Sequence, residues 1–298
     1  MEGNSNYSLV QTGDRKLKTI VWNVAGGLAK KLRSSFFQDI LNAYDIIIFV
    51  ETHLDESESL DAIKSMSLFS VVRSDRTVAH APSGGVLVLV RKDVGVEWDF
   101  QIFKDAGIVT LDIPARQFEG IAKPVVVVAC YVVPQTSTRV AVWARNERLR
   151  GLQAIEDIIA SSVGWKEVLI LGDPNARVGN RTEWVPNEID GSSCRETRKE
   201  NGNHWLRDIN PDSCLNDNGR VYLDLCRSFG LLIANGRSIP AEFTRFGPTA
   251  ASVPDVWLGT EAVLRSLGDG RVHEINTFSD HVPISFFYGG CSAGGQLR

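Results

Sequence analysis

Hydrophobic residues recur along the chain in short runs that predict alternating strands and helices. Residues 45–51 and 125–133 contain uninterrupted apolar runs, which is typical of strands that are buried on both faces. Apolar residues at helical spacing predict helices at residues 32–43, 140–162 and 220–229. Further strands are predicted at residues 17–23, 69–73, 85–91, 108–113, 168–172, 231–234, 241–245, 255–258, 272–278 and 282–287.

The order of these elements predicts the fold class. Many strands at hairpin spacing, mixed with helices, favour an α/β (α+β) fold in four layers. In this αββα sandwich, two mostly antiparallel sheets face each other and helices cover their outer faces. We expect residues 17–288 to form one domain, between a polar N-terminal lead (1–16) and a tail (289–298). Periodicity stops between residues 174 and 218, and a polar segment of that length is usually functional or disordered.

Composition narrows the class of protein. Of the 298 residues, 43% are hydrophobic and 23% are charged, which excludes disordered and fibrous proteins. No run approaches the roughly 20 apolar residues that cross a bilayer, so we expect no membrane partner. The N-terminus has no apolar segment of a secretory signal, and the five cysteines include no CxxC pair. We therefore expect a nuclear or cytoplasmic protein that is not secreted.

The net charge of −4 is the wrong sign for a protein that holds nucleic acid by bulk electrostatics alone. It fits an enzyme whose acidic pocket is neutralised by a bound cation. The charge neither proves nor excludes a nucleic-acid substrate, and no pattern in the sequence predicts an oligomeric state.

Polar residues recur where apolar strands end. Asn23, Glu51, Tyr131 and Asp173 each follow an apolar run, and Asp255 precedes one. Alone, each such residue is commonly a turn former or a helix cap. Together with the SDH sequence at residues 279–281 they form a set that unconnected caps do not explain. We therefore expect them to meet in one site.

Cleavage of a phosphodiester by water explains the metal side of this set. Mg²⁺ prefers carboxylate oxygens and keeps several waters. Glu51 is suited as such a ligand because it is a lone carboxylate at the end of an apolar strand, and Asn23 can contribute without adding charge.

The same reaction explains the remaining residues. Asp173 and His281 are the candidates for orienting and activating water, and Asp255 could fix the tautomer of the histidine. Asn175 and Tyr131 can donate hydrogen bonds to a phosphoryl oxygen as it becomes more negative.

These motifs, in this order, resemble those of the endonuclease/exonuclease/phosphatase superfamily. The resemblance runs from residue 17 to about residue 287 and is most specific at SDH followed by VPIS, then at GDPN. It is carried by Trp22 and Asn23, Glu51, Gly84 and Gly85, Tyr131 in CYVVP, GDPNARVG at 172–179, FTRF…SVPD at 243–255, and SDH at 279–281.

One subgroup is especially similar. The sequence NDNGRVYLDLCRSFGLLIANG at residues 216–236 resembles the apurinic-like endonuclease domain of non-LTR retrotransposons. That resemblance implies a DNA endonuclease that nicks one strand of a double-stranded target, so that the new end primes reverse transcription. It implies Mg²⁺ as the cofactor, with Mn²⁺ as a possible substitute, and nuclear residence.

The resemblance also implies individual roles. Asn23 and Glu51 would lie on the metal side, with Asp280 at the metal edge. The phosphate and nucleophile residues would be Tyr131, Asp173 and Asn175, and Asp255 would be the partner of His281. Thr244 and Ser252 occupy positions that often contact the DNA backbone, and Asn218 would border the groove.

The chain departs from the family pattern at two prolines. Pro174 stands where an aromatic residue is usual, and Pro254 directly precedes Asp255. Proline fixes φ and removes an N–H group, so the loop that carries Asn175 is expected to be set differently. Neither proline removes a chemical group from the proposed site.

Basic residues near these motifs have two interpretations. Arg177 and Arg181 closely follow GDPN and are candidates for contact with nucleic acid. Lys30, Lys31 and Arg33 follow the loop after Asn23 and could touch phosphates, but a solvated helix start is the favoured interpretation.

Three functions therefore compete. The first is a DNA endonuclease of the retroelement type, which the 216–236 sequence favours. The second is another enzyme on the same scaffold: an exonuclease, an RNA deadenylase, or a phosphatase of inositol phosphates or lipids. The third, less favoured because every expected acid, base and metal residue is present, is a non-catalytic binding module.

Overall fold

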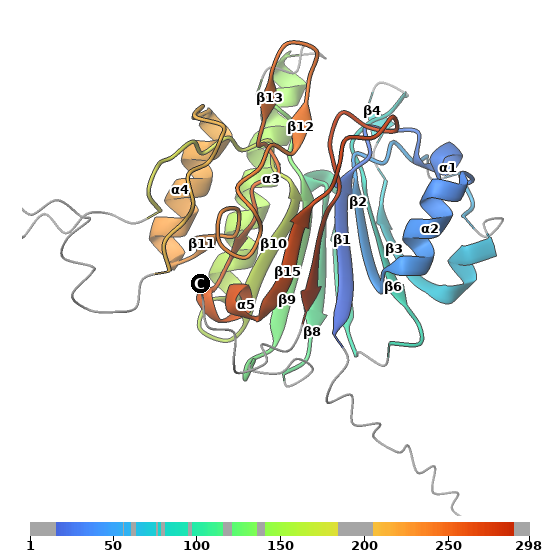
Figure 1. Ribbon diagram of the computed structural model, residues 1–298, viewed down its shortest axis with the longest axis horizontal. Coiled ribbons are helices and arrows are strands. Elements are labelled where there is room, and N and C mark those ends of the chain that lie inside the picture. Colours follow the sequence, from blue (N-terminus) through green and yellow to red (C-terminus); the bar gives the residue numbers. More distant parts are fainter. Residues whose placement is uncertain are drawn as a thin grey trace, which may run out of the picture.

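Two six-stranded sheets lie face to face in the computed structural model, with helices on both outer faces (Figure 1). This arrangement confirms the predicted αββα sandwich. The structure describes residues 16–55, 57–60, 64–75, 77–78, 81–94, 97–115, 121–135, 141–183 and 205–288.

The first sheet has the strand order β15-β16-β1-β2-β6-β3. Only β1 and β2 run parallel in it, and every other neighbouring pair is antiparallel. Its strands are β1 (Leu17–Asn23), β2 (Ile46–Val50), β3 (Phe69–Ser74), β6 (Val86–Arg91), β15 (Leu267–Val272) and β16 (Ile284–Tyr288).

The second sheet has the order β11-β14-β10-β9-β8-β7, and only β9 and β10 run parallel in it. Its strands are β7 (Asp99–Phe103), β8 (Ile108–Ile113), β9 (Val125–Tyr131), β10 (Glu167–Asp173), β11 (Leu232–Ile233) and β14 (Leu258–Gly259). Two short hairpins complete the described strands: β4 (Thr77–Val78) with β5 (Ala81–Pro82), and β12 (Arg245–Phe246) with β13 (Ala251–Ser252).

The central strands are apolar at successive positions because both of their faces are buried. In β2, Ile46, Ile48 and Val50 face the core between the two sheets, whereas Ile47 and Phe49 face the helical side. The helical layer there consists of α1 (Leu28–Lys31) and α2 (Ser35–Ala43).

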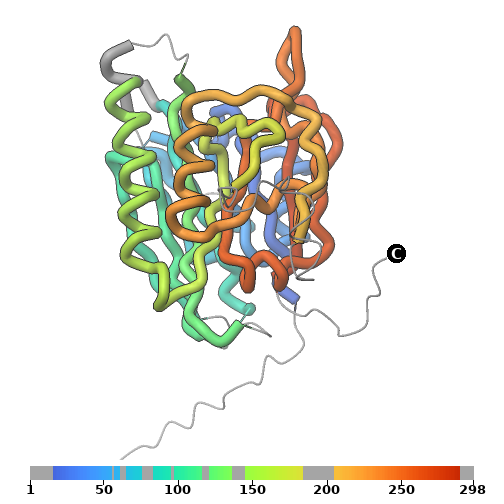
Figure 2. Tube along the Cα trace, turned by 90° about the vertical axis from the view of Figure 1, so that its left-hand side faces the viewer, coloured from blue at the N-terminus to red at the C-terminus, as the bar shows by residue number. Residues whose placement is uncertain are grey.

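The other sheet is covered by α3 (Ala141–Ser162) and α4 (Asp217–Phe229), which lie next to each other in Figure 2. A short helix α5 (Glu261–Ser266) follows β14, and 3₁₀ turns occupy η1 (Lys64–Leu68) and η2 (Lys104–Ala106). None of the described helices combines the length and apolarity needed to span a membrane.

Several predicted elements differ from the observed ones. The helix predicted at 32–43 is observed as α2, which begins only at Ser35 because the Ser34 side chain caps its N-terminus, and the separate short helix α1 precedes it. The strand predicted at 272–278 is wrong: β15 ends at Val272, and the Asn276 side chain accepts from the Phe278 N–H group in a local turn. The strand predicted at 241–245 overlaps the observed strand β12 only at Arg245.

The site owes its position to the two parallel strand pairs. In the register, Asn23 at the end of β1 lies opposite Val50 at the end of β2, and Asp173 at the end of β10 lies opposite Tyr131 at the end of β9. A hydrogen bond from Asn23 to Asp173 joins the two pairs. The β12–β13 hairpin rises from the upper rim of the sandwich (Figure 1).

Candidate active site

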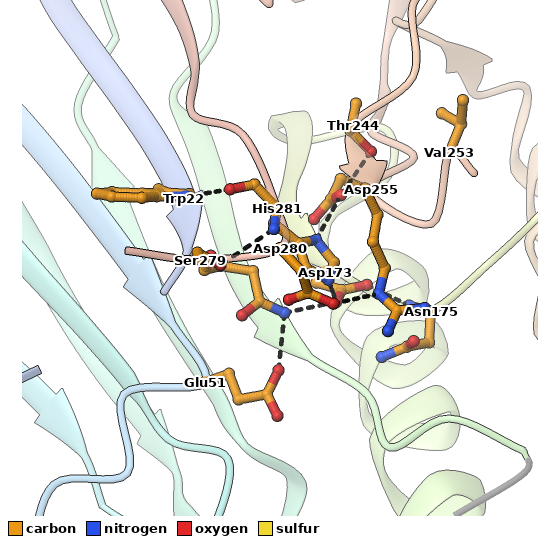
Figure 3. Close-up of polar contacts among 12 residues, drawn as sticks. Trp22, Glu51, Asp173, Asn175, Thr244, Val253, Asp255, Ser279, Asp280 and His281 are labelled. Carbon is orange, nitrogen blue, oxygen red and sulfur yellow. Dashed lines mark hydrogen bonds and ion pairs between the residues drawn. The ribbon is translucent and has the colours of Figure 1, made fainter. Parts of the chain in front are cut away.

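A histidine between two aspartates forms the centre of the site (Figure 3). His281 Nδ1 lies 2.9 Å from Asp255 Oδ2, and its Nε2 lies 3.8 Å from Asp173 Oδ2. The buried Thr244 hydroxyl donates to the same Asp255 oxygen over 2.6 Å. Asp255 therefore fixes the imidazole with Nε2 turned toward Asp173. We call Asp173, Asp255 and His281 the buried cluster.

The loop that carries His281 is tied to the end of β1. Trp22 Nε1 donates to the His281 carbonyl over 2.8 Å, and the Ser279 hydroxyl donates to the Asn23 carbonyl over 2.8 Å. The His281 N–H group in turn donates to Ser279 Oγ. The first two bonds join segments more than 250 residues apart, and all three hold the loop of His281 in place.

A second, more open group of carboxylates borders the buried cluster. Glu51 directly follows β2, and its carboxylate lies 3.6 Å from His53 Nε2. Asp280 pairs with Arg245 over 2.9 Å at the surface. The Glu51 side chain is 26% exposed and that of Asp280 is 37% exposed, against 1% for Asp173. We call Glu51 and Asp280 the acidic edge.

Asn23 joins the two groups. Its Nδ2 donates to Glu51 Oε2 over 2.9 Å and to Asp173 Oδ2 over 2.7 Å, while its Oδ1 accepts from the Ala25 N–H group. One neutral amide thus separates two carboxylates that would otherwise repel each other. Residues from both ends of the chain meet in a single acidic site.

Charge coupling within the buried cluster sets its protonation. Burial by itself lowers the pKa of His281, but the negative charges of Asp255 and Asp173 outweigh burial and raise this pKa to about 9. Burial and the charge of Asp255 raise the pKa of Asp173 to about 7. The cluster therefore combines an imidazolium with a carboxyl group that exchanges its proton near neutral pH.

Glu51 is shifted in the opposite direction. Burial acts to raise its pKa, but hydrogen bonding from His53 and Asn23 outweighs burial and lowers it. The Glu51 carboxylate is therefore kept ionised. Glu51 also has a φ of 54° and His53 a φ of 49°, left-handed values that cost non-glycine residues about 1–2 kcal/mol each.

Asn175 and Tyr131 lie beside Asp173. The Asn175 N–H group donates to Asp173 Oδ1 over 2.8 Å, and its side-chain amide donates to the Val132 carbonyl over 2.9 Å. Asn175 also has a left-handed φ of 49°, which turns the loop directly after Pro174. Tyr131 is buried and pairs in register with Asp173.

Two residues at the start of α4, within the 216–236 segment, support this loop through hydrogen bonds. Asn216 caps α4 and donates to the Asn175 carbonyl over 2.8 Å, and Asn218 donates to the Pro174 carbonyl over 2.9 Å. Asn218 is 0% exposed, so in this conformation it positions the Pro174 loop and has no surface to offer to DNA.

The other residues predicted to contact nucleic acid lie in different environments. Arg177 makes a two-pronged ion pair with the buried Asp212, at 2.7 and 2.6 Å, which leaves it partly exposed. Thr244 is buried against Asp255, whereas Ser252 is half-buried on the β13 strand of the projecting hairpin. Of the four, Ser252 and Arg177 present surface to a ligand.

Some contacts in the site were not predicted from the sequence. The bond from Trp22 to His281, the pairing of Arg245 with Asp280 and the link from Ser279 to Asn23 all join segments far apart in the chain. The only sequence signal for them was their presence within the WN, FTRF and SDH motifs.

The geometry of the site agrees with a family profile that matches most of the chain. The sequence profile described as "Endonuclease/Exonuclease/phosphatase family" matches residues 20–281. The chain belongs to the endonuclease/exonuclease/phosphatase family. No curated protein sequence matches it.

Solved structures share the fold of this family member. A 3′-5′ exonuclease from Neisseria meningitidis superposes with a TM-score of 0.59 at 18% identity, covering 92% of this chain and 100% of the other. An AP endonuclease from Archaeoglobus fulgidus gives a TM-score of 0.59 at 17% identity, covering 91% and 99%. An AP endonuclease from Leishmania major gives 0.64 at 12% identity, covering 93% and 89%. At sequence identities this low, the similarity shows only that the fold is shared.

The family is one of divalent-metal-dependent hydrolases, and the site offers suitable ligands. Within the described residues, Asp173, Asp255 and His281 present ligand atoms within 4.8 Å of one another. The acidic edge provides a second candidate position with oxygen ligands and more access to water. Oxygen ligands and retained waters are what Mg²⁺ prefers, so the edge fits this ion better than the histidine-containing cluster does.

Proposed function

We propose that this family member is a Mg²⁺-dependent DNA endonuclease that nicks one strand of a duplex, leaving an end that primes reverse transcription of a retroelement. The observation that carries the proposal is the amide of Asn23, which contacts both Glu51 and Asp173 while Asp173 faces His281. The proposed acid–base groups and the proposed metal ligand thus meet at one amide.

The protonation states suggest how the residues divide the reaction. A water oxygen forms the new bond to phosphorus, and the bond from phosphorus to the 3′ oxygen breaks; the departing 3′ oxygen takes a proton from solvent water, leaving a 3′-hydroxyl and a 5′-phosphate. Asp173 accepts the proton of the attacking water, because its raised pKa matches neutral pH. The imidazolium of His281 donates from Nε2 to a non-bridging phosphoryl oxygen.

Glu51, positioned by the Asn23 amide and joined by Asp280 on the acidic edge, would hold the metal ion. When bound, Mg²⁺ neutralises the charge that develops on the phosphate and on the leaving oxygen. Asn175 and Tyr131 lie next to Asp173 and would orient the same phosphate. Mn²⁺ has a similar preference for oxygen ligands and would substitute.

The retroelement assignment is supported by residues 216–236. This sequence resembles the retrotransposon endonuclease domain, and its Asn216 and Asn218 hold the loop that carries Asn175. For the duplex substrate, the β12–β13 hairpin is bridged to the site between Arg245 and His281, and its half-buried Ser252 would contact a DNA backbone there.

Relaxation of supercoiled plasmid with Mg²⁺ tests the proposal. Wild type should produce relaxed circles, and His281→Ala and Glu51→Ala should not. Glu156→Ala, which removes an exposed carboxylate on α3, is the control and should retain wild-type nicking. Intact supercoiled plasmid with wild-type enzyme over a range of Mg²⁺ and Mn²⁺ concentrations would refute the proposal.

A 3′-end nuclease or phosphatase is the second candidate, and a structural neighbour favours it. A Neisseria structure described as a 3′ phosphatase bound to product DNA hairpin has a TM-score of 0.59 and covers 92% of this chain. A hairpin with a 3′-phosphate separates the two functions. Release of inorganic phosphate without plasmid nicking would select the second candidate.

A further inference from the structure

One lysine of the basic cluster after Asn23 is held differently from its neighbours. Lys31, the last residue of α1, donates from Nζ to the Val24 carbonyl. Lys30 and Arg33 on either side of it are exposed. The three basic residues therefore do not form one uniformly solvated helix face.

The Val24 carbonyl lies at the junction of the two metal-side strands. Val24 directly follows Asn23, and its N–H group donates to the Val50 carbonyl over 3.0 Å. Gly26 donates in the same way to the Glu51 carbonyl over 2.7 Å. A group bound to Val24 is therefore fixed beside the residues that present Asn23 and Glu51.

The acidic edge lies within electrostatic range of this ammonium, and among the described residues no ion pair joins Lys31 to Glu51 or Asp280. Glu51 contacts Asn23 and His53, and Asp280 pairs with Arg245. Burial lowers the pKa of Lys31, and the charges of Glu51 and Asp280 oppose that effect, which places both carboxylates within electrostatic range. A half-buried ammonium acts on nearby charges more strongly than an exposed one, because less water screens it.

We propose that Lys31 is a phosphate-contact residue, whose ammonium binds an oxygen of the DNA backbone next to the acidic edge. The inference rests on the proposed function for its substrate. A site built from Glu51, Asp173 and Asp280 repels a polyanion, and a cation fixed by the protein offsets that repulsion on the substrate side. Lysine is a common point-charge partner of phosphate.

Salt-dependent binding of a short fluorescent DNA duplex tests this inference. All proteins carry His281→Ala so that the duplex stays intact, and Lys31→Met is compared with Lys30→Met and Lys31→Arg. Loss of one phosphate contact should flatten the slope of log K against log salt by about 0.9. Lys31→Met should show this change with about tenfold weaker binding, as expected for one charge-assisted hydrogen bond.

The two controls separate electrostatic from structural effects. Lys30→Met should bind as its parent does, and Lys31→Arg should keep the slope because it keeps the charge. Weaker binding by Lys31→Met with an unchanged slope would mean that the side chain only anchors Val24, and it would overturn the inference. So would a Lys31→Met protein that matches Lys30→Met in both affinity and slope.

The plasmid assay keeps the two proposals apart. If wild type nicks plasmid but Lys31→Met leaves the salt slope unchanged, the inference alone fails. If wild type does not nick plasmid but the slope depends on Lys31, the proposed reaction fails and the nucleic-acid contact stands. No binding of the duplex by the parent protein overturns the inference.

Discussion

The two halves of the site use the same kind of side chain in opposite ways. Asp173, in the buried cluster, has lost contact with water, and its pKa is raised to about 7. Glu51, on the acidic edge, is partly open and accepts hydrogen bonds, and its pKa is lowered. Surroundings, and not residue type, give one carboxyl group a pKa near neutral pH and keep the other ionised.

Asn23 makes this division possible. Because its amide touches both carboxylates, the two can lie close together without sharing a proton, as two directly opposed carboxylates would. The comparison predicts that substitutions in the buried cluster remove the proton-transfer step. Substitutions in the acidic edge should instead weaken metal binding, so added Mg²⁺ should restore activity in the second kind of variant but not in the first.

The largest expected effect comes from Asp173→Asn. This change keeps the shape but removes the proton acceptor, so nicking should fall by about 10²- to 10⁴-fold. Because the lost group is not proposed to be the main metal ligand, additional Mg²⁺ should not restore the rate. Plasmid relaxation measured across a Mg²⁺ titration gives the result, and recovery at high Mg²⁺ would place Asp173 on the metal side instead.

Glu51→Gln is the matched change on the acidic edge. Loss of one ligand charge weakens affinity for hard cations, so the half-saturating Mg²⁺ concentration should rise by about tenfold or more. Activity should then recover substantially as Mg²⁺ increases, unlike that of Asp173→Asn. A loss of rate that is equal at all Mg²⁺ concentrations would remove the distinction between the two halves of the site.

Asp255→Asn should change the pH dependence of the buried cluster. The negative charge of Asp255 raises the pKa values of both His281 and Asp173. Without that charge, both limbs of the kcat/KM profile should move to lower pH, with a rate loss at the optimum of about tenfold to a hundredfold.

Because Asp173, Asp255 and His281 titrate as a coupled group, the two limbs of the pH profile are not assigned to single residues. The informative result is that both limbs move in the same direction. Thr244→Val, which removes only the hydroxyl bond to Asp255, is the control and should leave the limbs nearly in place. Movement of the alkaline limb to higher pH in Asp255→Asn would contradict the assigned role of Asp255.

Much of the fold could be predicted from apolar runs, and the failures have physical causes. The uninterrupted runs of β2 and β9 are explained by burial on both faces. The edge strand β7 is not among the predicted strands, although its sequence DFQIF alternates polar and apolar residues; four of its five positions are exposed, so this alternation does not mark a buried face. The false strand at 272–278 contains apolar residues, yet its Ile275 is exposed and a turn forms at Asn276.

The site could be predicted as a set of residues but not as a set of contacts. Strand ends and motifs identified Glu51, Asp173 and His281, because those positions depend on local sequence. The different environments of Asp173 and Glu51 depend on how strands from the two sheets meet, which no local pattern encodes. The same holds for Lys31, whose neighbours on the helix are solvated while it is bound to Val24.

The smallest expected effect tests how the acidic edge is built. Gly26 has a φ of 78°, and a Cβ at this position would overlap the imidazole of His53, which contacts Glu51. Gly26→Ala should therefore displace His53 and weaken Mg²⁺-dependent nicking by about tenfold, the usual effect of losing a residue that orients a metal ligand.

Gly27→Ala is a matched control, because its φ of 65° imposes similar strain while nothing lies within 4 Å of the added carbon. Both variants should lose about 1–2 kcal/mol of unfolding free energy, but only Gly26→Ala should need more Mg²⁺. If Gly27→Ala raised the Mg²⁺ requirement equally, backbone strain and not the position of His53 would account for the effect, and the acidic edge would not depend on that imidazole.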